Sequence, residues 1–128
     1  ATSLQKHFQT IVQARLQNNG QSCIAAKRYI IHQSIYPFFL EQLESYLSKL
    51  HLDPPTEATA TLACCINKEA AIKLEQQIQE AISQKATVIY RYPTPEYAPA
   101  SFFPPTILEV LNPNNISYQE ELFGPIFT

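Results

Sequence analysis

The chain has 128 residues, of which 45% are hydrophobic and 16% are charged, and its formal net charge is −2 at pH 7. This length predicts one domain, and this balance of apolar and charged residues is typical of a globular protein rather than a disordered one. The small negative charge does not favour binding to nucleic acid or to an anionic membrane, and no apolar run approaches the roughly 20 residues of a membrane-spanning helix.

The first half of the chain predicts two helices with a turn and a short strand between them. Apolar residues recur at helical spacing over residues 4–17, and Ser3 is a candidate N-cap. The sequence "NNGQ" interrupts this helix, and residues 26–32 have the β-branched and aromatic composition of a strand. Ser34 is the candidate cap of a second helix over residues 34–50, which carries a clear apolar stripe.

The second half predicts one more helix and further strands. Asn67 is the expected cap of a helix over residues 67–84, whose glutamines at positions 76, 77 and 79 are interpreted as a solvated face. Residues 86–91 and 106–111 have the composition of strands, and the proline-rich residues 93–105 exclude a helix. The sequence "GPIFT" at the end approaches another strand. Helices and strands therefore alternate, which favours an α/β fold with helices layered on a sheet.

The residue composition gives two further indications. The chain contains no methionine, and its ten prolines outnumber its two glycines, Gly20 and Gly124, so we interpret it as an internal piece of a larger protein. Three cysteines without metal-ligand spacing favour a reducing, cytoplasmic compartment over a disulfide scaffold, and the adjacent Cys64 and Cys65 are expected to be free thiols. The histidines are isolated from one another in the sequence and lack the spacing of metal ligands, so we expect no metal site.

Cys23 follows one of the two glycines in the sequence "NNGQSC". A glycine permits a tight turn, and exposed backbone N–H groups near a cysteine favour its nucleophilic thiolate form. The same N–H groups can hold an oxyanion. A lone cysteine is also a common small residue of the core, so the local pattern alone leaves both interpretations open.

The residues around Cys23 resemble the catalytic-cysteine segment of the NAD(P)-dependent aldehyde dehydrogenases. The shared pattern consists of Asn18, Gly20, Gln21 and Cys23, followed by alanine and a lysine-arginine pair. Further along, "INKEAAIKLEQQIQEAISQ" and "FFPPTILEV" look like the connecting helix and strand of that family. The resemblance therefore covers nearly the whole chain.

A second motif, about a hundred residues after Cys23, supports the same resemblance. The sequence "EELFGP" is similar to the family's Glu-x-Phe-Gly-Pro signature and supplies Glu121, Phe123, Gly124 and Pro125. Both glycines of the chain belong to these two motifs, where we expect the backbone to turn tightly beside a reacting substrate or cofactor.

The resemblance implies an activity and roles for three residues. In the family, a cysteine attacks an aldehyde to give a thiohemiacetal, hydride passes to the nicotinamide, and the resulting thioester is hydrolysed. It implies that Cys23 is the nucleophile, with its own backbone N–H in the oxyanion hole. It also implies that Glu121 hydrogen-bonds the nicotinamide-ribose hydroxyls and that Phe123 packs near the nicotinamide. A solvated carboxylate and a core aromatic are the alternative interpretations of Glu121 and Phe123.

The resemblance also implies what the chain lacks. Residues 1–128 correspond to part of the cysteine-bearing catalytic domain, whereas the dinucleotide-binding domain, with the oxyanion-hole asparagine and the general-base glutamate, is absent. We therefore expect the parent protein to use NAD or NADP, and the isolated chain to be inactive and to hold neither. The surface toward the missing domain would be exposed or covered by a second copy, so self-association is expected.

The chain departs from the family where glycines are usual. The family's Leu-Gly-Pro-Leu-Ile-Asn reads "LACCIN" with Ala63 at the glycine, Lys85 stands where a glycine follows the connecting helix, and Arg91-Tyr92 replaces a Gly-Gly pair. Each replacement costs on the order of 1 kcal/mol unless the turn is rebuilt. This motivates a rival hypothesis, in which the parent is a drifted or truncated relative that keeps the fold as a structural or interaction module.

Within the family, the blocks "NNGQ", "AAKR", "FFPPT" and "YQEELFGP" look most like the bacterial succinate-semialdehyde dehydrogenase branch. This implies a small aldehyde, succinate semialdehyde, as substrate. The region that discriminates NAD from NADP is missing. The pair Lys27-Arg28 either neutralises the acidic tail of such a substrate or forms a solvated strand edge.

Overall fold

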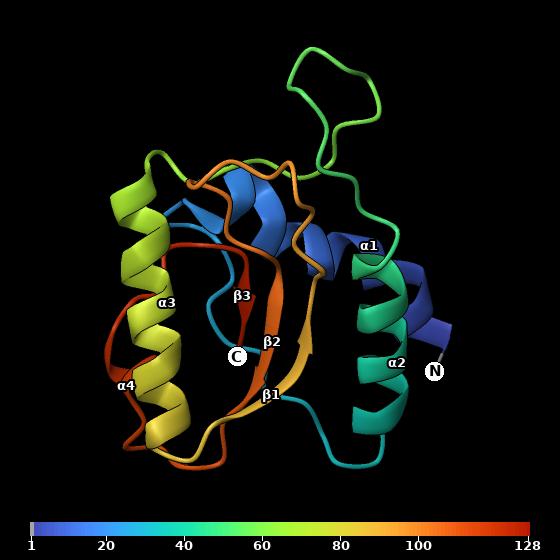
Figure 1. The fold of residues 1–128 in the computed structure, drawn as a ribbon. Helices are drawn as coiled ribbons and strands as arrows, with labels where there is room; N and C mark the ends of the chain where they lie inside the picture. Colours follow the sequence, from blue (N-terminus) through green and yellow to red (C-terminus); the bar gives the residue numbers. More distant parts are fainter. Residues whose placement is uncertain (1) are drawn as a thin grey trace.

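A small mixed sheet lies between two groups of helices in the computed structural model, which describes residues 2–128 (Figure 1). This arrangement confirms the predicted α/β layered fold. In chain order the elements are α1 (Thr2–Leu16), the short 3-10 helix η1 (Gln17–Gly20), α2 (Tyr36–Leu47), α3 (Lys68–Ser83), β1 (Thr87–Arg91), β2 (Thr106–Glu109), α4 (Ile116–Gln119) and β3 (Ile126–Phe127).

The sheet has the strand order β1-β2-β3, with β2 in the centre. β1 pairs with β2 in antiparallel orientation and carries a bulge between Val88 and Tyr90, whereas β3 pairs with β2 in parallel. Because successive side chains of a strand point to opposite faces, Ile107 and Leu108 enter two different cores. The central strand therefore joins the two halves of the domain.

Each face of the sheet carries its own apolar core. The core under α1 and α2 contains aromatic side chains from both helices, and the rings of Phe8 and Phe39 meet edge to face with their centroids 5.5 Å apart. The core under α3 and α4 is mainly aliphatic and uses Leu74, Ile78 and Ala81 at helical spacing on α3. Burial of each large apolar side chain contributes about 1.5–3 kcal/mol, so these two stripes hold the helices on the sheet.

The three long helices confirm the predicted periodicities, but only one of the predicted caps is found where expected. The side chain of Asn67 caps α3, and its Oδ1 accepts a hydrogen bond from the Ala70 N–H at 2.8 Å. Ser34 does not cap α2, because its Oγ lies 2.8 Å from Nδ1 of His32 and Ile35 occupies the cap position. Within residues 2–128, no helix has both the length and the apolar character to cross a membrane.

Residues 26–32, predicted to be a strand, form no ladder, so that prediction is wrong. The Tyr29 N–H donates to the carbonyl of Thr128 at 2.7 Å, and the Thr128 hydroxyl donates to the carbonyl of Lys27 at 2.8 Å. One backbone hydrogen bond beside the two-residue strand β3 does not make a strand pair. The segment is fastened instead to α1, where the Tyr29 hydroxyl donates to the carbonyl of Ile11 at 2.8 Å.

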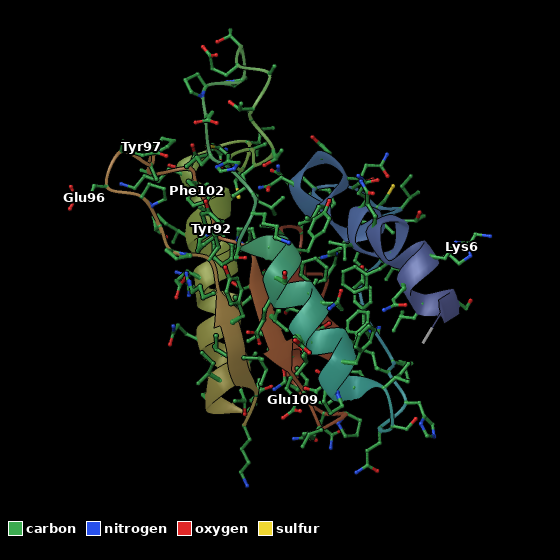
Figure 2. The ribbon with its side chains drawn as sticks, turned by 90° about the vertical axis from the view of Figure 1, so that its right-hand side faces the viewer. Lys6, Tyr92, Glu96, Tyr97, Phe102 and Glu109 are labelled. Carbon is green, nitrogen blue, oxygen red and sulfur yellow. The ribbon has the colours of Figure 1, made fainter. Side chains whose placement is uncertain are left out.

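The proline-rich residues 93–105 form no helix, as predicted, and they form no strand either. Figure 2 shows Tyr92 and Tyr97 on the stretch of chain that leaves β1. The Tyr92 hydroxyl donates to the carbonyl of Leu50 at 2.9 Å, and the Tyr97 hydroxyl donates to the carbonyl of Leu52 at 3.1 Å. These bonds tie the segment to the residues that follow α2.

Sequence analysis missed the short helix α4. Asn115 caps this helix, since its Oδ1 accepts from the Ser117 N–H at 3.0 Å, and its Nδ2 donates to the carbonyl of Ala81 at 2.9 Å. Four residues are too few for a helical period to be recognised in the sequence. The asparagine therefore both starts α4 and fastens it to α3.

Lys85 ends α3 in the left-handed conformation, with a φ of 72°. Its N–H donates to the carbonyl of Ile82, and the Ala86 N–H donates to the carbonyl of Ala81, both at 2.9 Å. These two bonds make the Schellman motif, in which the left-handed position is usually glycine. The turn therefore keeps the conformation of the glycine that the family resemblance implies, with a lysine in its place.

Lys85→Gly should stabilise the folded chain. Glycine removes the strain of a left-handed Cβ but adds freedom to the unfolded chain, so we expect a net gain of about 0.5–1 kcal/mol in the free energy of unfolding. Urea denaturation followed by circular dichroism measures this change. Arg91→Gly is the matched control: Arg91 lies in β1 and pairs with Glu75, so its replacement should destabilise the chain. A loss of stability in Lys85→Gly would contradict the left-handed assignment.

Candidate active site

The chain makes a left-handed turn shortly before Cys23. Asn18, Asn19 and Gly20 have successive φ values of 49°, 57° and 73°. Asparagine tolerates this conformation better than most residues because its side chain bonds locally, and the Asn18 Nδ2 donates to the carbonyl of Gln21 at 3.0 Å. The turn ends α1 and leads directly into the cysteine.

The two glycines of the chain pack against each other. A Cβ atom on Gly20 would lie 2.1 Å from the carbonyl oxygen of Gly124, closer than a side-chain atom can approach. A Cβ atom on Gly124 would lie 2.3 Å from Cδ1 of Leu74, which belongs to the core under α3. The two sequence motifs therefore meet backbone to backbone, which gives a steric reason for both glycines.

Cys23 is exposed on a second turn. The Ala25 N–H donates to the carbonyl of Ser22 at 3.1 Å, and the Ile24 N–H donates to the Ser22 hydroxyl oxygen at 3.4 Å. Among residues 2–128, no hydrogen-bond acceptor is found for the Cys23 N–H, so this group can hold an oxyanion. Exposure of the thiol excludes the interpretation of Cys23 as a small residue of the core.

The other two cysteines are less suited to nucleophilic chemistry. All three are free thiols, but Cys64 is half-buried and Cys65 is buried. Burial, together with the neighbouring Cys64, raises the pKa of the Cys65 thiol. A raised pKa lowers the fraction of thiolate, which is the reactive form. Cys23 is the thiol that an external substrate can reach.

The buried side chain of Arg15 links the two motifs. It is 1% exposed; its Nη1 donates to the carbonyl of Ala26 at 3.1 Å, and its Nη2 donates to the carbonyl of Leu122, 107 positions later, at 2.5 Å. Burial lowers the pKa of this guanidinium to about 10, although Tyr29 and Glu121 act in the opposite direction. No partner for its Nε is found among the described residues. The buried cation thus holds two backbone segments that are distant in sequence.

The side chain of Lys27, which is partly exposed, contacts both motifs. Its Nζ donates to the carbonyl of Ser22 at 2.7 Å and pairs with Oε1 of Glu121 at 2.7 Å. The same ammonium lies 5.2 Å from the centroid of the Phe123 ring, within the range of a cation–π interaction. Glu121 and Phe123 are therefore brought to the cysteine turn, and Lys27 is not the solvated edge residue of the sequence-based alternative.

A cavity of about 370 Å³ opens beside Cys23. Its lining includes Cys23 and Arg28 from the first motif and Glu120 and Glu121 from the second. The Arg28 guanidinium lies 5.2 Å from the ring centroid of Tyr118, which also lines the cavity. The space is large enough for a small organic substrate beside the thiol, with charges of both signs in its wall.

Glu121 and Phe123 present a carboxylate and an aromatic ring to solvent. The Glu121 side chain is 50% exposed and Phe123 is 45% exposed, so neither is core. Lys27 occupies only Oε1 of the carboxylate, so Oε2 can accept hydrogen bonds from sugar hydroxyls. The flat ring can pack against a heterocycle. These two residues therefore fit the ribose and the nicotinamide of the cofactor that the family resemblance implies.

Gln21 and Pro125 attach the motifs to the rest of the domain. The Gln21 Nε2 donates to the carbonyl of Cys64 at 3.2 Å, and its Oε1 accepts from the Ile66 N–H at 2.9 Å. Pro125 is buried, and its carbonyl accepts from the N–H of Thr106 in β2 at 3.0 Å. Both residues therefore position the motifs. Within the described chain, no group of His, Cys, Asp and Glu side chains is arranged to hold a metal ion.

Sequence analysis missed Arg15 and misassigned Gln77. The prediction that Gln77 belongs to a solvated face is wrong, because it is buried and its Nε2 donates to Oε2 of Glu120 at 2.9 Å and to the carbonyl of Glu121 at 3.4 Å. Its position three residues after Leu74 puts it on the buried face of α3, and Arg15 likewise follows a buried valine by three residues. This three-residue spacing from a buried apolar residue was the signal in the sequence that could have predicted the burial of Gln77 and Arg15.

Comparison with known proteins identifies relatives over nearly the whole chain. The model of the Aldehyde dehydrogenase family matches residues 1–128. A succinate-semialdehyde dehydrogenase [NADP(+)] of Mycobacterium avium is 32% identical over 126 residues, which cover 98% of this chain and 26% of that protein. A protein of the same name from Deinococcus radiodurans is 38% identical over 112 residues, which cover 88% and 23%.

A solved structure has the same fold. The crystal structure of succinate-semialdehyde dehydrogenase from Burkholderia pseudomallei superposes on this chain with a TM-score of 0.86 and 31% sequence identity. The match covers 97% of this chain and 26% of that one. The chain thus spans about a quarter of the length of the relatives it matches.

Gly20→Ala should destabilise the chain far more than a left-handed φ alone explains. The added Cβ would meet the backbone of Gly124, which cannot move as a side chain can, so we expect a loss of about 3 kcal/mol or more. Asn18→Gly is the matched control, because it keeps the left-handed turn without adding an atom and should change stability by less than about 1 kcal/mol. Urea denaturation compares them; equal midpoints for Gly20→Ala and the unchanged chain would contradict the close contact.

Proposed function

Because the chain belongs to the aldehyde dehydrogenase family, we propose that it is the cysteine-bearing part of an enzyme that oxidises an aldehyde to a carboxylic acid. The observation that carries this proposal is the convergence of the two motifs at one place. Cys23 and Glu121 line the same cavity, and Phe123 lies against the lysine that pairs with Glu121. The meeting of a reachable thiol with groups that fit a nicotinamide cofactor supports this reaction class.

In the proposed reaction, the Cys23 thiolate attacks the carbonyl carbon of the aldehyde. A carbon–sulfur bond forms, and the carbonyl oxygen becomes the oxyanion of a thiohemiacetal, toward which the free Cys23 N–H can donate. The nicotinamide cofactor, when bound, supplies the oxidation by accepting a hydride from this carbon. Water then attacks the resulting thioester, breaks the carbon–sulfur bond and releases the carboxylic acid with the thiolate restored.

The two carboxylates that line the cavity are each engaged by a neighbouring side chain. Glu120 accepts a hydrogen bond from Gln77, and Glu121 pairs with Lys27. A general base must reach the attacking water directly or through one intervening water. We therefore propose that this base comes from a part of the intact enzyme outside this chain, and that Glu121 serves the cofactor instead.

Substrate and cofactor are proposed from the relatives. The proteins of Mycobacterium avium and Deinococcus radiodurans are both named succinate-semialdehyde dehydrogenase [NADP(+)]. We propose succinate semialdehyde as the aldehyde and NADP⁺ as the oxidant of the intact enzyme, with NAD⁺ as the alternative cofactor. The three free thiols support a reducing, cytoplasmic compartment.

The rival hypothesis is a relative that keeps the fold without catalysis. It rests on the missing family glycines at Ala63, Lys85, Arg91 and Tyr92. Of these four, only Lys85 has a positive φ, and it follows the end of α3. Cys23, Glu121 and Phe123 are retained and exposed, which favours the enzyme.

Cys23→Ala in the intact enzyme should abolish aldehyde oxidation, because among the described residues Cys23 is the one thiol that lines the cavity. Glu121→Gln should raise the KM for the nicotinamide cofactor, because a neutral amide is a weaker acceptor for ribose hydroxyls. Steady-state kinetics with succinic semialdehyde measure both effects. Cys64→Ala is the matched control and should keep near-normal activity. Full oxidation by the Cys23→Ala enzyme would contradict the role of Cys23 as the nucleophile, whereas an intact protein without any aldehyde oxidation would favour the non-catalytic rival.

The isolated 128-residue chain should react with a small thiol reagent at Cys23 but should not turn over. The two carboxylates among its described cavity residues are engaged by Gln77 and Lys27, and the chain spans about a quarter of the length of its relatives. Incubation with succinic semialdehyde and NAD⁺ or NADP⁺, followed by the absorbance of the reduced cofactor, tests this, with Cys23→Ala as the blank. Exposed apolar side chains such as Ile30 and Leu111 support self-association of this chain, which sedimentation of the same preparation measures. Sustained turnover above the blank would contradict the expectation.

A further inference from the structure

Lys27 is the one side chain that makes direct contact with both Glu121 and Phe123 while also binding the cysteine turn, within the described residues. Its ammonium donates a hydrogen bond to the Ser22 carbonyl and forms an ion pair with Oε1 of Glu121. The face of the Phe123 ring lies 5.2 Å away. One cation thus joins the residue before the proposed nucleophile to both groups of the proposed cofactor site.

The ion pair between Lys27 and Glu121 contributes little to the stability of the fold. The side chain of Lys27 is 27% exposed and that of Glu121 is 50% exposed, and ion pairs in contact with water are weak and screened by salt. Its effect is geometric. A half-exposed glutamate can adopt several rotamers, whereas the contact with Lys27 keeps Oε1 occupied and leaves Oε2 free in one orientation.

The neighbouring cations cannot take over this function. Arg28 stacks on the ring of Tyr118, and the guanidinium of Arg15 is committed to backbone carbonyls below the site. Replacement of Lys27 would therefore release Glu121 and Phe123 together, while both motifs stay attached through Arg15 and the glycine contact.

We propose that Lys27 is a positioning residue for the nicotinamide cofactor: it holds the Glu121 carboxylate and the Phe123 ring beside the Cys23 turn before the cofactor binds. This inference rests on the proposed function, because it assigns Glu121 and Phe123 to the cofactor. Lys27 does not touch the reacting atoms. It lowers the free-energy cost of ordering two exposed side chains at the moment of binding.

The test measures NADP⁺ binding to the intact enzyme by isothermal titration calorimetry in the absence of aldehyde. We expect Lys27→Gln to weaken binding by about three- to tenfold, because it removes a charge-assisted contact without shortening the side chain greatly. Lys27→Arg should retain most of the affinity, since it keeps the cation. Lys49→Gln, at an exposed lysine of the segment after α2, is the matched control and should bind like the unchanged enzyme. In kinetics, Lys27→Gln should raise the cofactor KM with less than about a twofold change in kcat.

A double-mutant cycle separates positioning from general damage. In a Glu121→Gln background, Lys27→Gln should cause a smaller loss of NADP⁺ affinity than it causes in the unchanged enzyme, because one of the two groups that it positions is already altered. Equal affinity of Lys27→Gln and the unchanged enzyme, with weakened binding by Glu121→Gln, would overturn the positioning role and leave the proposed function standing. Tighter binding by Lys27→Gln would also overturn it. If Glu121→Gln bound normally and Cys23→Ala stayed active, the proposed function itself would fail.

Discussion

The approach of two backbone segments at Gly20 and Gly124 is the contact on which the rest of the site depends. A single Cβ on the first glycine would collide with the carbonyl oxygen of the second at 2.1 Å. This contact sets how closely the cysteine turn lies against the second motif. Pro125 follows Gly124 in the chain, and its carbonyl accepts a hydrogen bond from the N–H of Thr106 in β2. The contact between the two glycines is therefore attached to the central strand. The buried strand β2 thereby holds the two motifs that carry the exposed site residues.

Holding two loops in this way has a cost in folding free energy. Left-handed asparagines cost about 1 kcal/mol or more each, and two of them precede Gly20. Arg15 is buried with no partner for its Nε, and burial lowers the pKa of its guanidinium to about 10, which means that the folded state disfavours the charged form. Removing the partners of a buried cation strongly destabilises a protein, whereas replacing the buried charged groups with hydrophobic residues of similar volume can leave the stability unchanged. The arginine is therefore better explained by the two carbonyls that it spans, which belong to different motifs, than by the stability of the fold.

The sequence predicted the features that depend on local periodicity and capping. The spacing of Leu74, Ile78 and Ala81 predicted α3, and Asn67 predicted its start, because both signals lie within one helix. The errors have a different origin. A strand over residues 26–32 needs a partner with several backbone groups to pair with, and the structure provides one backbone bond, to the carbonyl of Thr128 just after β3. The burial of Gln77 and the contacts of Lys27 depend on Glu120 and Glu121, which lie far away in the sequence. The resemblance named the residues of the site, but their mutual geometry follows from tertiary contacts that no local pattern encodes.

The two remaining glycines distinguish a strained conformation from a lack of space. Asn18, Asn19 and Lys85 all have positive φ without being glycine, so this chain tolerates a conformational cost of about 1 kcal/mol per position. It keeps glycine where a Cβ would strike other atoms. Both glycines are thus required for packing whether or not the protein is catalytic, and they say little about function by themselves. Cys23, Glu121 and Phe123 differ from them in this respect, because all three are exposed and none is needed to fill a core. Cys23 and Glu121 line one cavity, and Lys27 contacts both Glu121 and Phe123. Packing does not explain this arrangement, and it is the reason to assign chemistry to this site.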